Sequence, residues 1–266
     1  MGNRFLAPFV VLSRNWNLCK RLFVRDFAAR YKESILGIVW AAAIPLLMLA
    51  AYAFVFGILR SPSAHDEGVP FTLMMYSGLV FVTFFAECVS RAPMLVIANA
   101  NYVKKVVFPI EIEAWVAILV ALSHLGINFA IFLLVAVVVG VQVHLQVLLA
   151  PLAVVPFVLT TVGLVWFVSA LTVYLRDLVQ IVPVLASLTA LFAPIFYPIS
   201  QVPHQLRWLV WINPVTPVVD FMRGLVFHGQ LPDALLFAES MAASLAIAIA
   251  GYAFFMKLRQ GFADVL

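Results

Sequence analysis

Long uncharged runs of apolar residues alternate with short polar segments along this chain. Residues 36–59 contain no charged side chain, and a helix rising about 1.5 Å per residue over that stretch crosses a bilayer core of about 30 Å. A second apolar run, 71–89, is interrupted only by Glu87 near its end. The stretch 114–175 has no Lys, Arg, Asp or Glu and is too long for one crossing, and a polar break at 140–146 divides it. The pattern therefore predicts four membrane-spanning helices, the last two forming a hairpin.

The final third of the chain is less regular. Residues 178–206 are uncharged but contain four prolines, so only their first part is predicted to be a fifth span. Residues 195–233 combine prolines, tryptophans and charged side chains, a mixture typical of short interfacial or re-entrant helices. The uncharged run 240–256, which can be extended backward through Leu235, predicts the sixth span.

These runs predict an all-α integral membrane protein with six transmembrane helices. An N-terminal amphipathic interface helix precedes the spans, and short re-entrant periplasmic helices lie between spans five and six. Residues 1–35 are predicted to be a cytoplasmic amphipathic segment, and residues 36–266 a six-helix transmembrane domain. We expect a single domain overall.

Composition supports the bilayer as the solvent. Hydrophobic residues make up 65% of the chain and charged residues 11%, whereas soluble domains are about half apolar and a quarter charged. Thirteen of the sixteen Lys and Arg residues lie at the two chain ends or in the loops predicted to share their side of the membrane. The positive-inside rule therefore predicts that both termini are cytoplasmic. The basic residues are not interleaved with aromatics, so nucleic acid is not an expected partner.

Several kinds of chemistry are missing from the sequence. No Gly-Lys dipeptide occurs, so the phosphate-binding loop is absent and any ATP and Mg²⁺ must be bound by another polypeptide. Carboxylates are too sparse, and histidines too scattered, for a metal site or for an enzyme at the membrane face. The only ionisable groups in the predicted spans are Glu87 and His124, and His124 is expected to be a hydrogen-bonded residue between helices. Cys19 and Cys88 are expected to form neither a disulfide nor a zinc site.

A helix through residues 14–32 would be amphipathic. Its basic face would carry Arg14, Arg21, Arg25 and Lys32, and its apolar face Cys19, Phe23 and Phe27. The basic stripe could meet anionic lipid head groups or the phosphates of an amphiphilic substrate, and a generic positive-inside anchor fits equally well. Arg30 and Asp26 interrupt the apolar side, so part of that face is expected to contact protein.

The loop 99–113 can form a short helix that ends near Pro109 and presents Lys104 and Lys105 to the cytosol. Such a segment would suit docking of a cytoplasmic partner, and it would equally suit a plain membrane-flanking loop.

Two aromatic stripes recur at helical spacing, one formed by Tyr52 and Phe56 and the other by Phe81, Phe84 and Phe85. Aromatic stripes in membrane helices usually face lipid or neighbouring helices. The alternative interpretation is a conduit in which these rings stack on sugars.

The residues resemble a known family. Arg30-Tyr-Lys-Glu-Ser-Ile-Leu-Gly-Ile-Val-Trp40, followed by Pro45-Leu46, resembles the entry to the first span in permeases of ABC transporters that export polysaccharides such as O antigens and wall teichoic acids. Further similar segments follow in order along the chain: Asn101-Tyr-Val-Lys-Lys-Val-Val-Phe-Pro109, Leu175-Arg-Asp-Leu178, Ala193-Pro-Ile-Phe-Tyr-Pro198, Asn213-Pro214 with Arg223, and Gly261-Phe-Ala-Asp-Val265.

The resemblance implies a six-helix permease that forms a homodimer and binds two copies of a separate ATP-binding subunit to export lipid-linked polysaccharide. By resemblance, a gate that receives the carrier diphosphate would comprise Arg25, Arg30, Tyr31 and Lys32. The coupling segment seated in the ATPase would comprise Asn101, Tyr102, Lys104, Lys105, Phe108 and Pro109. Family members often carry Arg where this chain has Ile110, so a salt bridge from that position is not carried over. Export of a drug or small lipid, and glycan transfer at the membrane, stay open as alternatives.

Overall fold

The computed structural model describes residues 7–32, 35–59, 69–100, 108–197 and 202–266, and within these ranges all regular structure is helical. Helices are the expected solution in lipid, because they satisfy backbone hydrogen bonds within one segment. Five of them are long and apolar enough to cross a membrane. They are α3 (Val39–Leu59), α4 (Phe71–Ile97), α6 (Ile112–Val138), α7 (Ala150–Tyr174, preceded by the short η2, Leu145–Leu149) and α11 (Ala234–Arg259).

The helix in the position of the predicted fifth span is shorter than the others. α8 runs from Leu178 to Phe192, 15 residues, and at about 1.5 Å per residue it is shorter than a bilayer core of about 30 Å. Beyond it lie the short elements η4 (His204–Leu206), α9 (Arg207–Ile212), α10 (Val215–Arg223) and η5 (Gly224–His228). The prolines of this region therefore restrict helix length, as the sequence predicted.

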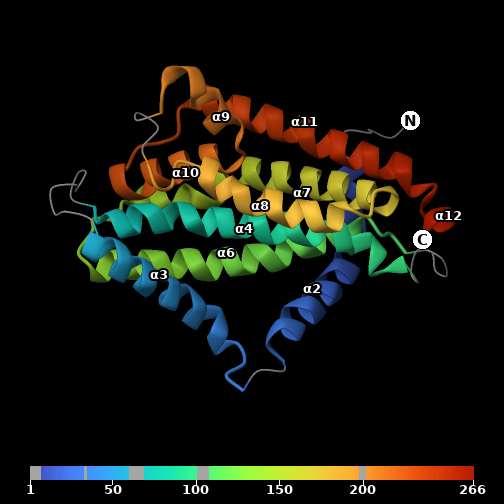
Figure 1. The fold of residues 1–266 in the computed structure, drawn as a ribbon, viewed down its shortest axis with the longest axis horizontal. Coiled ribbons are helices and arrows are strands. Elements are labelled where there is room, and N and C mark those ends of the chain that lie inside the picture. Colours follow the sequence, from blue (N-terminus) through green and yellow to red (C-terminus); the bar gives the residue numbers. More distant parts are fainter. Residues whose placement is uncertain (1–6, 33–34, 60–68, 101–107, 198–201) are drawn as a thin grey trace.

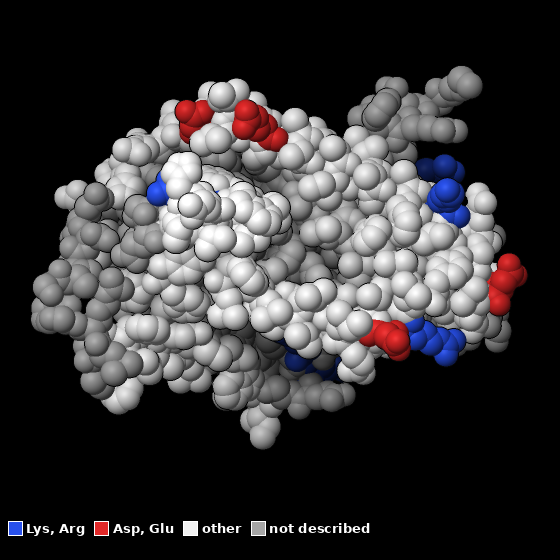
Figure 2. Space-filling view, turned by 45° about the horizontal axis from the view of Figure 1, so that its top comes forward, with Lys and Arg blue, Asp and Glu red and all other residues white. Residues whose placement is uncertain are grey.

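The long helices lie side by side in a bundle (Figure 1). α4, α6, α7, α8 and α11 run roughly parallel to the long axis of the molecule, while α2 (Trp16–Tyr31) and α3 are inclined to it, below α6 in this view. Charged side chains are sparse on the face shown in Figure 2, which is mostly uncharged. A surface of this kind suits contact with lipid rather than water.

Contacts between distant segments define the two ends of the bundle. At one end, which we call the terminus end, Trp115 Nε1 donates to the carbonyl of Pro8 at 3.2 Å, and the last helix turn, α12 (Phe262–Val265), lies nearby. At the opposite end the backbone N–H of His144 donates to the carbonyl of Val226 at 3.2 Å. The α6–α7 hairpin and the η5 region therefore share one side, as the sequence pattern predicted.

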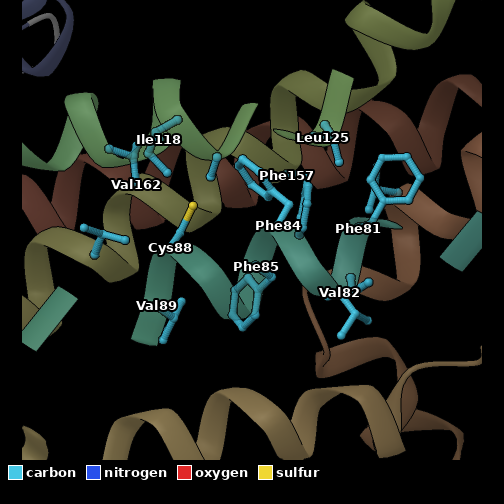
Figure 3. Packing of buried hydrophobic residues seen from close by; sticks show 14 of the residues in the cluster. Phe81, Val82, Phe84, Phe85, Cys88, Val89, Ile118, Leu125, Phe157 and Val162 are labelled. Carbon is cyan, nitrogen blue, oxygen red and sulfur yellow. The ribbon is translucent and has the colours of Figure 1, made fainter. Parts of the chain in front are cut away.

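The core of the bundle is aromatic. Phe81, Phe84 and Phe85 of α4 are only 1%, 2% and 4% exposed. All three rings lie close to Phe157 of α7, with centroids 5.3–6.2 Å apart (Figure 3). Rings enclosed in this way leave no face exposed for stacking on a sugar in this structure. They pack helices together. Tyr52 and Phe56 are half-buried, and Phe56 lies against Phe71 at 5.6 Å.

The most extensive helix contact in the described chain joins α7 to α11. It is made possible by glycines, because a Cβ added to Gly251 would lie 2.1 Å from the carbonyl oxygen of Gly163. A Cβ on Gly163 would lie 2.6 Å from the carbonyl oxygen of Ile247. Small residues at a crossing allow two backbones to approach closely, which is how helices associate where lipid removes the hydrophobic driving force.

A buried arginine anchors the proline-rich end. Arg223 donates to the carbonyl oxygens of Pro194 at 2.8 Å and of Met74 at 2.9 Å. Burial lowers the pKa of Arg223 to about 10, with Asp220 opposing the shift, so the guanidinium remains charged at neutral pH. Asn213 also attaches this end to α8, because its side-chain amide donates to the carbonyl of Thr189 at 2.8 Å.

The sequence predicted one continuous helix through residues 14–32, but the structure has a break near its start. The N-terminal segment divides into α1 (Ala7–Arg14) and α2, with Asn15 outside helical geometry at φ −112° and ψ 23°. The Asn15 side chain donates to the carbonyl of Val11 at 2.9 Å, a local bond of the kind that competes with the helix. The break lets α1 reach Trp115 while α2 takes a different direction.

The α7–α11 crossing can be tested with two glycine substitutions. We expect Gly251→Ala to force the helices apart and to lower the melting temperature of the purified protein, because the new Cβ would overlap backbone atoms. Gly126→Ala is the matched control, since nothing lies within 4 Å of a Cβ built there. Alanine at that helical position is neutral or stabilising by up to about 1 kcal/mol. Equal melting temperatures for the two variants would contradict the close crossing.

Candidate functional site

The predicted amphipathic helix is only partly a surface helix. α2 packs mainly on α6, and Cys19 is fully buried there. Burial, aided by the nearby Glu113 carboxylate, raises the pKa of the Cys19 thiol to about 11, so it is protonated at neutral pH. Cys19 and Cys88 are both free and buried. The face that carries Arg21 and Arg25 is exposed.

A carboxylate inside the bundle organises the contact between α2 and the spans. Glu87 of α4 has a side chain only 12% exposed, and it forms an ion pair with Arg30 of α2. Nδ1 of His124, on α6, lies 3.0 Å from both carboxylate oxygens. Three helices thus meet at one anion.

The histidine is enclosed by aromatic rings. Phe27 stacks on His124 with centroids 5.7 Å apart, and Tyr31 meets it edge-on at 6.1 Å. Burial raises the pKa of the Tyr31 hydroxyl, although Arg30 acts in the opposite direction. The other ring nitrogen, Nε2, is buried and has no hydrogen-bond partner among the described residues. The expectation that His124 is a hydrogen-bonded residue between helices is confirmed.

A second ion pair lies beside the first. The Asp26 carboxylate accepts from Arg25 at 2.8 Å and lies 3.7 Å from the guanidinium of Arg91 on α4. Asp26 and Arg30, which interrupt the apolar side of α2, therefore contact protein, as the sequence predicted. The two ion pairs between α2 and α4 have opposite polarity. α2 supplies the arginine in Arg30–Glu87 and the carboxylate in Asp26–Arg91.

The two pairs border a groove with a cavity volume of about 910 Å³ between α2, α4 and α8. Its lining comprises Asp26, Ala29, Arg30, Val82, Thr83, Ala86, Glu87, Ser90, Arg91, Ser187 and Ala190. Charged and hydroxyl groups share the groove with small apolar side chains, and it is large enough for a head group with several polar atoms. The hydroxyls of Thr83 and Ser187 donate to carbonyls of their own helices, which leaves their oxygens able to accept hydrogen bonds.

The structure brings together some of the predicted gate residues. Arg25, Arg30 and Tyr31 gather at the α2 contact with α4 and α6, and Arg30 lines the groove. Lys32 is exposed at the end of α2. Most of the predicted coupling segment, Asn101, Tyr102, Lys104 and Lys105, lies outside the described residues, whereas Phe108 and Pro109 are half-buried.

Sequence reasoning missed Arg91 and the role of Glu87. Both residues lie between the ends of α4, which continues to Ile97, eight residues past the predicted end of the span at Val89. The available signal was that Glu87 and His124 were the only ionisable groups in the predicted spans. They lie far apart in sequence on neighbouring helices, so no local periodicity could pair them.

The family of this chain is identified by its similarity to known proteins. Residues 17–227, most of the chain, match the ABC-2 type transporter family. The chain belongs to that family. The match includes α2, α4, α6 and α8, and therefore every residue of the groove.

Relatives of this ABC-2 type chain cover nearly its whole length. It is 27% identical over 243 residues to the O-antigen export system permease protein RfbA of Klebsiella pneumoniae, covering 91% of this chain and 92% of that protein. It is 24% identical over 246 residues to the protein of the same name in Myxococcus xanthus, covering 91% and 93%. Identity to the polysialic acid transport protein KpsM of Escherichia coli is 24% over 221 residues, covering 80% and 83%.

The Glu87 centre can be tested by an isosteric substitution. We expect Glu87→Gln to lower the melting temperature, because Arg30 and His124 lose their anion, and charge-assisted bonds contribute about 1.5–3 kcal/mol each. Glu239→Gln, an exposed carboxylate on α11, is the control and should leave the melting temperature unchanged. In a double-mutant cycle, Arg30→Gln should cost less in the Glu87→Gln background than alone. Strict additivity would show that the two side chains do not interact.

Proposed function

We propose that this chain is the channel-forming subunit of an ABC transporter that exports lipid-linked polysaccharide, such as O antigen, from cytoplasm to periplasm. A separate ATP-binding subunit supplies the energy. The similarity to O-antigen export permeases over 91% of the chain carries this proposal. In it, all six apolar helices cross the inner membrane, α8 with help from the chain that follows it, and the terminus end faces the cytoplasm. α9, α10 and η5 form the re-entrant periplasmic segment.

A homodimer with two ATP-binding subunits is the proposed assembly. α3 supports it, because only 11% of its apolar window is buried inside this chain. Apolar side chains of α8, such as Leu185 and Leu191, are also more than half exposed. A second copy would bury part of this surface, and lipid would cover the rest.

The groove between α2, α4 and α8 is the proposed site for the carrier diphosphate. Arg30 and Arg91 lie in its wall, and each is held by a carboxylate of the protein. A diphosphate would compete with Glu87 and Asp26 for these guanidinium groups, so binding would loosen α2 from α4. The hydroxyl oxygens of Thr83 and Ser187 are placed to accept from sugar hydroxyls. The basic side chains Arg25 and Lys32 on α2 would guide the anion inward.

The proposed site predicts an export defect without loss of the protein. In a strain that depends on this chain, we expect the pair of substitutions Arg30→Gln and Arg91→Gln to lower surface polysaccharide about 10-fold or more, because charge-assisted contacts to phosphate contribute about 1.5–3 kcal/mol each. The amount of protein in the membrane should stay the same. Lys257→Gln, an exposed residue at the same end, should export normally. Normal polysaccharide with altered drug susceptibility would instead favour a small-molecule exporter.

The coupling segment predicts a separate phenotype. We expect replacement of Lys104, Lys105 and Phe108 by alanine to reduce co-purification of the ATP-binding subunit and to reduce export, with less effect on membrane insertion. The measurement is the amount of ATPase recovered per permease from solubilised membranes. Equal losses of insertion and recovery would leave the segment only a folding role. Turnover of lipid-linked sugars by the purified chain alone would favour a transferase.

A further inference from the structure

A single arginine at the end of the last long helix holds the turn at the end of the proposed coupling segment. Nη1 of Arg259 lies 2.7 Å from the Glu111 carboxylate, and Nη2 donates to the carbonyl of Phe108 at 3.4 Å. The Glu111 side chain is only 7% exposed. One guanidinium therefore spans the turn from Phe108 to Glu111, at the point where the chain enters α6.

The main chain of the same turn is held by α7. The carbonyl of Glu111 accepts from Nε1 of Trp166 at 2.9 Å, and Trp166 is fully buried. Its ring lies edge-on to Trp115 at 5.7 Å and to Tyr252 of α11 at 5.0 Å. Glu111 is thus fixed by its side chain to α11 and by its backbone to α7, the two helices that cross at Gly163 and Gly251.

The end of α11 is itself well supported. The Tyr174 hydroxyl donates to the carbonyl of Leu258 at 3.0 Å, and the fully buried Phe262 packs on Tyr174 and Phe255. These contacts hold the end of α11 that carries Arg259. Part of this support comes from the segment Gly261–Val265, one of those that resemble polysaccharide export permeases.

We propose that Arg259 is a positioning residue that transmits movement of the coupling segment to the α7–α11 pair. The proposal rests on the proposed function, because it assumes that the ATP-binding subunit acts on the coupling segment, whose last residues, Phe108 and Pro109, begin this turn. With the Arg259–Glu111 pair intact, displacement of that segment reaches α7 and α11 as well as α6. Without the pair, the Phe108–Glu111 turn absorbs the displacement, and ATP is hydrolysed without export.

The first test measures the turn directly and does not depend on transport. In the purified chain, Arg259→Gln should increase hydrogen–deuterium exchange of the amides of residues 110–113 about 10-fold relative to wild type. Lys257→Gln, an exposed basic residue on the last turns of the same helix, is the matched control and should not change it. Unchanged exchange in Arg259→Gln would overturn the proposal.

The second test separates coupling from folding in the reconstituted complex with the ATP-binding subunit. Arg259→Glu and Glu111→Arg should each lower polysaccharide exported per ATP hydrolysed about 10-fold, while ATPase co-purification and hydrolysis stay within about threefold of wild type. The double variant Arg259→Glu with Glu111→Arg should recover most of the ratio, because the ion pair is restored with reversed polarity. Should either reversal fail to fold, Arg259→Lys keeps the charge and loses the second contact, and a loss of about threefold is expected.

The outcomes distinguish the two proposals. Increased exchange with an unchanged ratio of export to hydrolysis would reduce Arg259 to a stabilising residue and overturn the positioning role. Failure of wild-type chain to recover any ATP-binding subunit would overturn the proposed function, and the exchange result would still report on the turn itself. Failure of the double variant to restore the ratio, with normal protein levels, would also contradict transmission through this ion pair.

Discussion

A carboxylate removed from water needs a nearby cation, and the contacts that distinguish this bundle from a plain set of apolar helices follow from that constraint. Glu111 is buried and the side chain of Glu87 is only 12% exposed, and each is paired with an arginine from a segment far away in sequence. The first pair attaches the amphipathic helix to the spans. The second pair, Arg259–Glu111, attaches the turn at the end of the proposed coupling segment to α11. Because removal of one partner would leave a poorly solvated charge, each pair favours one arrangement of the helices it joins.

The remaining contacts form a frame in which these pairs can act. Close approach at Gly163 and Gly251 makes α7 and α11 one unit, and aromatic packing around Phe157 joins α4 to it. Arg223 fixes the proline-rich end by donating to the carbonyl oxygens of Pro194 and Met74. By contrast, α2 is attached to α4 through the partly exposed arginines Arg30 and Arg91, so this attachment is the one that an anionic ligand could most readily displace. Such a division suits a transporter, which needs a stable frame and a few attachments that can be broken.

Differences between the sequence-based expectations and the structure have identifiable causes. At the helix break the Asn15 side chain makes a hydrogen bond to the Val11 carbonyl, a local contact that hydrophobic periodicity does not reveal. The stripe of Phe81, Phe84 and Phe85 was correctly placed on one helical face, but which neighbour covers that face depends on how α7 packs. α4 continues through Glu87 and Arg91 because both side chains find partners, whereas hydropathy alone ends the span near the first charge.

By itself, the sequence determined the order of the long apolar helices, the family resemblance and the basic face of α2. These follow from local patterns, because hydropathy over some twenty residues and the position of charges and prolines act within one helix. Only the tertiary structure decided that Glu87, His124 and Arg30 meet, that Arg91 joins the groove, and that Arg259 reaches Glu111. Those partners are brought together by the angles and depth at which helices cross, and helix packing depends on the shapes of both surfaces at once.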